Sequence, residues 1–196
     1  MLKLHTLALG NYQTNCYIIH EDQADTCIVI DPGFQAEDIL RELQGLGLTL
    51  AAILLTHGHF DHVGAVKTLA AETGCQVFLH PEELSLPETF TAGPLFYTDT
   101  YTDHAILSLA GLTFRVLHTP GHTPGSVCLL CEKHLFSGDT LFAGSCGRTD
   151  LPGGDWTAIR KSLLMLSQLE GEFAVHPGHG ESSTLALEKQ YNPYMQ

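Results

Sequence analysis

The feature that most constrains this sequence is a dense group of histidine and aspartate side chains directly after an apolar run. The run occupies residues 51–55, and the motif Thr-His-Gly-His-Phe-Asp-His follows it at residues 56–62. Four potential metal ligands fall within six residues: His57, His59, Asp61 and His62. Two histidines two positions apart point to the same side of an extended segment, and Gly58 between them lets the backbone turn tightly. This density and spacing predict a metal-binding loop rather than an exposed polar loop.

Three later segments, rich in glycine and proline or directly after an apolar run, each carry one further candidate ligand. They are His122 in Thr-Pro-Gly-His-Thr-Pro-Gly, Asp139 in Phe-Ser-Gly-Asp-Thr, and His179 in His-Pro-Gly-His-Gly. Taken singly, each residue fits an ordinary turn. Taken with the first motif, they complete a ligand count suited to two borderline divalent metal ions.

Composition excludes several classes of function. The 196 residues carry 9 basic and 22 acidic side chains, a net charge of −13, which repels phosphate backbones and argues against a nucleic-acid partner. No apolar run is long enough to span a bilayer, and the N-terminus lacks the pattern of a signal peptide, so we expect a cytoplasmic protein with no membrane partner. The 6 cysteines are dispersed and are expected to be free thiols. No linker or repeat interrupts the chain, which predicts one domain over residues 1–196.

Short apolar segments alternate with a few helical patterns along the chain. Strands are predicted at residues 15–20, 26–31, 51–56, 75–80, 112–117, 126–131, 134–137 and 173–176. Helices are predicted at residues 36–46, 63–73, 155–169 and 182–190, with Asp155 capping the third and Ser182 or Ser183 the last. The pattern predicts an α+β fold of sheets covered by helices, with the candidate ligands just beyond strand ends.

The motifs THGHFDH, PGHTPGS, FSGDTLF and HPGHG, in this order and at these separations, resemble the metallo-β-lactamase superfamily. They most resemble its hydroxyacylglutathione hydrolase (glyoxalase II) branch, and within it the short, single-domain members. The resemblance implies an αββα sandwich of two mixed sheets flanked by helices. It also implies the ligand sets: His57, His59 and His122 on one metal, Asp61, His62 and His179 on the other, and Asp139 bridging both.

The resemblance further implies two divalent ions, with zinc as the expected metal and iron or manganese as alternatives. It implies a hydrolase that cleaves small S-acyl thioesters such as lactoylglutathione with a metal-bridging hydroxide, and Asp61 and Asp139 as catalytic residues. Asp31 resembles a residue that orients the ligands by hydrogen bonding, and an Asx-turn residue is the equal alternative. Arg148 is a candidate for binding a substrate carboxylate or is a solvated loop residue. Full-length relatives carry a further C-terminal helical region that contacts glutathione, and this chain ends soon after His179.

Three alternatives share these motifs. A persulfide dioxygenase would hold a single iron by two histidines and one aspartate, and a β-lactamase proper often has cysteine where this chain has Asp139. The third alternative is a non-catalytic metal-binding or redox module, whose closed structural site would leave no open coordination position.

Other side chains are expected to have no part in the chemistry. Cys128 and Cys131, three positions apart in a strand and so on opposite faces, are expected to be buried thiols. The aromatic residues Tyr97, Phe142 and Trp156 are expected in the core, with the lining of a substrate pocket as the alternative. The histidines His80, His104, His118 and His134 lack ligand neighbours at metal spacing and are expected to be structural or surface residues, and His176 is expected to pack on a strand.

Overall fold

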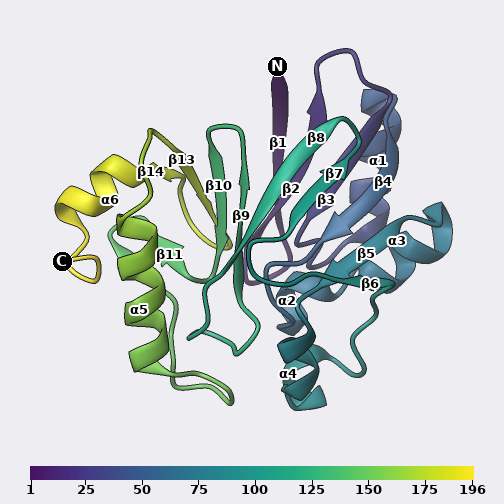
Figure 1. Cartoon of the computed structure of the whole chain (residues 1–196). Coiled ribbons are helices and arrows are strands. Elements are labelled where there is room, and N and C mark those ends of the chain that lie inside the picture. The colour runs from purple at the N-terminus through teal and green to yellow at the C-terminus, as the bar shows by residue number, and fades with distance from the viewer.

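Two six-stranded β-sheets pack face to face in the computed structural model, which describes residues 1–196, and helices lie on their outer sides (Figure 1). The first sheet has the order β1 (Leu2–Leu9), β2 (Thr14–Glu21), β3 (Thr26–Ile30), β4 (Thr49–Leu54), β5 (Gln76–Leu79) and β6 (Asp99–Thr100). Its first three strands are antiparallel, and β3 to β6 are parallel.

The second sheet is also mixed. Its order is β14 (Ser183–Thr184), β13 (Ala174–Pro177), β10 (His134–Gly138), β9 (Val127–Cys131), β8 (Leu112–His118) and β7 (Ile106–Leu109). Only β10 and β13 pair in parallel. A small hairpin, β11 (Leu141–Phe142) and β12 (Ser145–Cys146), follows β10.

Alternation along the buried strands divides the core into three layers. In β3, Cys27 and Val29 face the helices on the outer side, whereas Ile28 and Ile30 face the second sheet. Helices α1 (Ala36–Leu46) and α3 (Val66–Thr73) cover the outer face of the first sheet. Helices α5 (Trp156–Ser167) and α6 (Leu185–Tyr191) cover the outer face of the second. The predicted αββα sandwich is therefore confirmed.

All eight predicted strands are present, but six others were not predicted. The largest omissions are β1, in which only the two end residues are buried, and the edge strand β7. The predicted helix at 63–73 starts incorrectly: the structure has α2 (Phe60–Val63), a break, and then α3. A Cβ at Gly64 would lie 2.2 Å from the Gly33 carbonyl oxygen, so the 31–33 loop meets the chain at this break.

One of the two capping residues predicted from the sequence is confirmed and the other is wrong. The Asp155 side chain accepts a hydrogen bond from the Ala158 amide and caps α5 as predicted. The predicted cap of the last helix is wrong, since Thr184 caps α6 and Ser183 instead donates to Glu188. A 3₁₀ turn, η1 (Pro81–Ser85), and the short helix α4 (Glu88–Thr91) follow β5 and had no periodic signal. None of the helices combines the length and the apolar character needed to cross a membrane.

The layer between the sheets generates a stability prediction. Phe114 on β8 is fully buried there. Phe114→Ala should lower the free energy of unfolding by about 3–5 kcal/mol, because it removes buried apolar surface and leaves a cavity. Urea unfolding followed by circular dichroism measures the change. Ile106→Ala, on the paired strand β7 and 68% exposed, is the control and should change stability little. Equal effects of the two substitutions would contradict this assignment of the core.

Candidate metal centre

The predicted ligands come from five segments that meet at one end of the sandwich. The loop after β4 carries His57 and His59, and α2, which lies below the two sheets in Figure 1, carries Asp61 and His62. The other three ligands follow strands of the second sheet: His122 after β8, Asp139 after β10 and His179 after β13. The structure brings all seven together.

The first group of donors is all histidine. His57, His59 and His122 are at most 5% exposed, and their donor atoms lie within 4.8 Å of one another. The closest approach, 2.9 Å, joins His59 Nδ1 and His122 Nε2. Three imidazoles converge here without any carboxylate among them.

The second group combines a carboxylate with two histidines. The Asp61 Oδ2 atom lies 3.2 Å from His179 Nε2 and 3.7 Å from His62 Nε2. The two histidine nitrogens are 3.3 Å apart. Asp139 lies between the two groups, because its carboxylate oxygens are 3.5 Å from His122 Nε2, 3.5 Å from His62 Nε2 and 3.6 Å from His179 Nε2.

These residues fit a pair of metal ions. Three buried polar atoms have no hydrogen-bond partner: His57 Nε2, His59 Nε2 and Asp139 Oδ1. An unpaired buried polar atom costs about 1–3 kcal/mol, so such atoms are rare unless something else binds them. Two donors of one tetrahedral zinc ion lie about 3.4 Å apart, given bonds of about 2.1 Å. The distances between donors in both groups are close to that value.

The electrostatics favour the same conclusion. Burial, together with the neighbouring histidines, lowers the pKa of His57 well below its usual range and that of His59 to about 4, so both rings are neutral and keep a free lone pair. Burial also lowers the pKa of His62, but Asp139, Asp31 and Asp61 outweigh it and raise that pKa to about 9. Three carboxylates around one imidazole make this half of the cluster strongly attractive to a cation.

Hydrogen bonds behind the cluster fix the rings. Asp31 accepts from the Thr56 amide at 2.8 Å, from the Thr56 hydroxyl at 2.6 Å and from His62 Nδ1 at 3.0 Å. His122 Nδ1 donates to the Arg148 carbonyl at 2.8 Å. In His62 and His122 the Nδ1 bond leaves Nε2 facing the centre, as in metal sites whose histidine ligands are oriented by hydrogen bonds to the other ring nitrogen.

The N-terminal hairpin holds the last ligand. His179 Nδ1 donates to the carbonyl of Tyr12, in the turn between β1 and β2, at 3.1 Å. The neighbouring Gly178 carbonyl accepts from the Asn15 amide at 2.8 Å. Gly178 also needs to be glycine, since a Cβ there would lie 2.2 Å from Asp139 Oδ1 and 2.7 Å from His62 Cε1.

Residues 9–179 match the family model described as the metallo-β-lactamase superfamily. The chain belongs to the metallo-β-lactamase superfamily. It is thus a metal-dependent hydrolase of that superfamily with a histidine-rich candidate metal site.

Relatives within the superfamily differ in what their names state. Hydroxyacylglutathione hydrolase GloC of Haemophilus influenzae is 35% identical over 99% of this chain and 98% of its own length. The BLEG-1 B3 metallo-β-lactamase structure has a TM-score of 0.90 at 38% identity and covers 100% of both chains. TTHA1623 in a di-iron-bound form has a TM-score of 0.87 at 41% identity, covering 97% and 99%. ETHE1 from Myxococcus xanthus has a TM-score of 0.87 at 29% identity, covering 97% of this chain and 83% of its own.

The cluster opens on one side into a cavity of about 610 Å³. Besides the donors, its walls are formed by Tyr12, Phe60, Phe90, Phe142, Ser145, Cys146, Arg148 and Leu151. The Arg148 side chain lines this cavity but is 61% exposed and makes a two-pronged ion pair with Asp150, at 2.7 and 2.8 Å. Its role in binding substrate stays a prediction.

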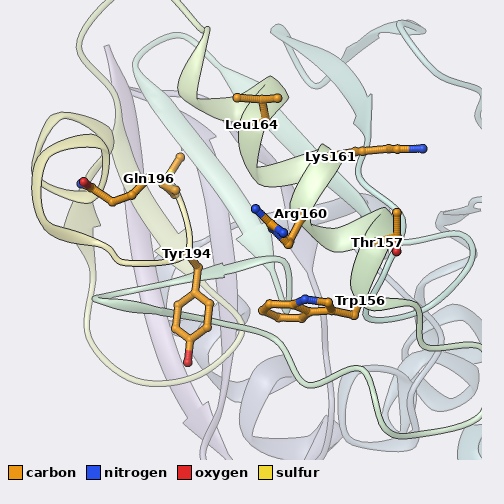
Figure 2. A pocket seen from close by; sticks show the side chains of 8 residues that line it. Trp156, Thr157, Arg160, Lys161, Leu164, Tyr194 and Gln196 are labelled. Atoms are coloured by element: carbon orange, nitrogen blue, oxygen red, sulfur yellow. The ribbon is translucent and has the colours of Figure 1, made fainter.

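Two aromatic residues expected in the core are partly exposed, and a third lines the cavity. Trp156 is 47% and Tyr97 38% exposed, so the core interpretation is wrong for both. Trp156 lies beside Tyr194 and Arg160 in a separate hollow along α5, which contains none of the predicted ligands (Figure 2). Phe142 lines the cavity of the metal centre. By contrast, Cys128 and Cys131 are buried on opposite faces of β9, as predicted.

Two of the discounted histidines do have potential ligands as neighbours. The donor atoms of His80, Glu82 and His118 lie within 4.8 Å of one another, and the two rings stack with centroids 4.2 Å apart. The prediction that His80 and His118 lack such neighbours is therefore wrong, because η1 folds back against the end of β8. His134 instead contacts His176, at 2.9 Å.

The position of Asp139 generates a prediction about metal content. Asp139→Ala should reduce bound metal from two ions per chain to one or none, because it removes the only carboxylate that lies against both groups. Elemental analysis of purified protein measures the ratio. Asp150→Ala, which removes an exposed carboxylate of the neighbouring loop, is the control and should retain two ions. Two ions in Asp139→Ala would contradict a bridging position.

Proposed function

We propose that this protein is a dinuclear metal-dependent thioesterase of the hydroxyacylglutathione hydrolase type, acting on small S-acyl thioesters such as lactoylglutathione. The observation that carries the proposal is the division of seven donors into two groups that meet at Asp139 and open into one cavity. The relation to GloC, over 99% of this chain, supports the thioester specificity.

Two divalent ions held in this position would supply a water of lowered pKa and a Lewis acid for a carbonyl oxygen. The remaining tasks belong to the chain. His57, His59 and His122 would hold one ion, Asp61, His62 and His179 the other, and Asp139 both. The Thr14 hydroxyl donates to Asp61 Oδ2 at 3.2 Å and fixes the orientation of that carboxylate at the cavity wall.

The titratable groups of the cavity suit a thioester better than an amide. Apart from the donors, only Tyr12, Cys146 and Arg148 line it with ionisable side chains, and burial raises the pKa of the Cys146 thiol. The pKa shift makes Cys146 a weaker acid than a free thiol, and the Arg148 guanidinium stays charged. A thiolate, whose conjugate acid has a pKa of about 8.5, departs without a proton donor, whereas the amine of a β-lactam needs one.

The cavity walls would accept the apolar part of a small substrate. Phe60 and Phe90 line the cavity together with Phe142 of β11 and Leu151 of the segment before α5. Its volume of about 610 Å³ lies within the range of about 300–1,000 Å³ typical of small-molecule sites. The net charge of −13 argues against a nucleic acid as substrate.

The histidine and carboxylate donors accept zinc, iron or manganese, and we propose zinc. The di-iron form of TTHA1623 is an observation on that protein and makes iron the first alternative.

One observation favours a second candidate, a mononuclear-iron persulfide dioxygenase. Asp61, His62 and His179 by themselves form a group of two histidines and one carboxylate, the donor set of non-haem Fe(II) oxygenases. The number of ions bound per chain separates this candidate from the first.

An activity comparison tests the proposal. The metal-replete protein should hydrolyse lactoylglutathione, lose that activity in a chelator and recover it with added metal. Nitrocefin should be turned over about 100-fold more slowly, because an amine nitrogen leaves far less readily than a thiolate unless it is protonated. Oxygen uptake with glutathione persulfide and one iron per chain would instead establish the dioxygenase. Faster turnover of nitrocefin than of any thioester would reject the thioesterase.

The ion pair between Arg148 and Asp150 predicts that the two alanine substitutions change KM in opposite directions. If Arg148 binds a substrate carboxylate, it must exchange Asp150 for the substrate. Arg148→Ala should then raise KM for an anionic thioester about tenfold, and Asp150→Ala, which frees the guanidinium, should lower it. Steady-state kinetics with an anionic and a neutral thioester measure both values. Unchanged KM in Arg148→Ala would leave the arginine as a solvated loop residue.

A further inference from the structure

Glu83, in η1, is a fully buried carboxylate with no counterpart in the sequence motifs. Its two oxygens bond to two different loops. Oε2 accepts a hydrogen bond from the Gly58 amide at 2.5 Å, and Oε1 accepts one from the Gly125 amide at 2.7 Å. The carboxylate therefore joins backbone segments that lie on opposite sides of it.

Both loops carry ligands of the first group. Gly58 is the residue between His57 and His59, and Gly125 follows three residues after His122. All three histidine donors of that group thus belong to the two loops that Glu83 joins.

Close packing leaves no space for a side chain at either glycine. A Cβ at Gly58 would lie 2.9 Å from Leu95 Cδ1 and 3.0 Å from Glu83 Oε2, and a Cβ at Gly125 would lie 2.8 Å from Glu83 Oε1 and from the Glu83 amide nitrogen. The approach of Glu83 therefore explains the glycine at 125, and at 58 it does so together with the Leu95 side chain.

A buried carboxylate is expensive unless hydrogen bonds compensate it. Burial raises the pKa of Glu83, and the bonds from Thr123, Gly58 and Gly125 oppose that rise. Asp31 is a second buried carboxylate behind the cluster, where it contacts Thr56 and His62. The Thr56 hydroxyl in turn lies 3.1 Å from His57 Nδ1.

We propose that Glu83 is a positioning residue that holds the His57–His59 loop against the His122 loop and thereby sets the metal affinity of the first group. The inference rests on the dinuclear centre proposed above. It predicts that loss of the carboxylate weakens one of the two metal positions and spares the other.

The test is Glu83→Gln. Glutamine keeps the volume, but its amide nitrogen must face one of the two backbone N–H groups, so only one of the bonds can form. Glu88→Gln is the matched control, because it removes the same charge at an exposed position five residues further on, in α4, which belongs to neither loop and to no group of potential metal ligands. His122→Ala and His179→Ala identify which equivalent of metal belongs to which group.

Apoprotein is titrated with Zn²⁺ against a chromophoric chelator, and separately with Co²⁺ while its visible absorption is recorded. Glu83→Gln should weaken the equivalent that His122→Ala removes by about 10–100-fold, as is typical when support behind a ligand is lost. The equivalent that His179→Ala removes should change less than threefold, and the Co²⁺ spectrum should change only for the first. Glu88→Gln should match the unsubstituted protein in both.

Circular dichroism of each apoprotein shows whether it is folded. If Glu83→Gln is unfolded, Gly125→Ala replaces it, since it keeps the carboxylate and displaces it, and the same selective weakening is expected. Unchanged affinities, or equal weakening of both equivalents, overturn the inference while leaving the dinuclear centre intact. Fewer than two equivalents bound by the unsubstituted protein would overturn the centre and the inference together.

Discussion

Carboxylates and imidazoles are crowded together at one end of this sandwich, and the rest of the structure holds them there. Asp139 lies 3.5 to 3.6 Å from the nitrogens of three histidines that belong to two different groups. Without a cation, several of these atoms have no partner. When a cation is bound, the same atoms would be its ligands. The two sheets are the means by which five distant segments reach one place, because each segment follows directly from a strand or a helix whose position is fixed by packing.

The arrangement explains why one scaffold accommodates several chemistries within the superfamily. The donors are fixed by hydrogen bonds from behind, such as those from Asp31 to His62 and from His122 to the Arg148 carbonyl. The cavity walls are a separate set of residues, several of them from the short elements α2, α4, β11 and β12. In this chain the apolar part of the walls consists mainly of Phe60, Phe90, Phe142 and Leu151.

The sequence was sufficient for the elements that carry strong local signals. The motif at 56–62 follows a buried strand, so its density of ligands was readable without a structure, and the helix at 36–46 was placed correctly. The break at Gly64 was not, because it arises from the approach of the Gly33 carbonyl, a contact between segments that no periodicity records. Glu83 was missed for the same reason. It lies in a single 3₁₀ turn, and its importance depends on two amides 25 and 42 residues away.

The contact between His179 and the turn at Tyr12 joins residues 167 positions apart. Almost the whole chain must be synthesised and folded before the last donor arrives, so a nascent or truncated chain has no complete second position to offer a metal. A metal ion that binds the native chain and not the unfolded one therefore stabilises the native fold. A free metal concentration 1,000 times the dissociation constant adds about 4 kcal/mol to stability by mass action alone. Scarcity of metal in the cell would therefore lower the amount of folded protein as well as its activity.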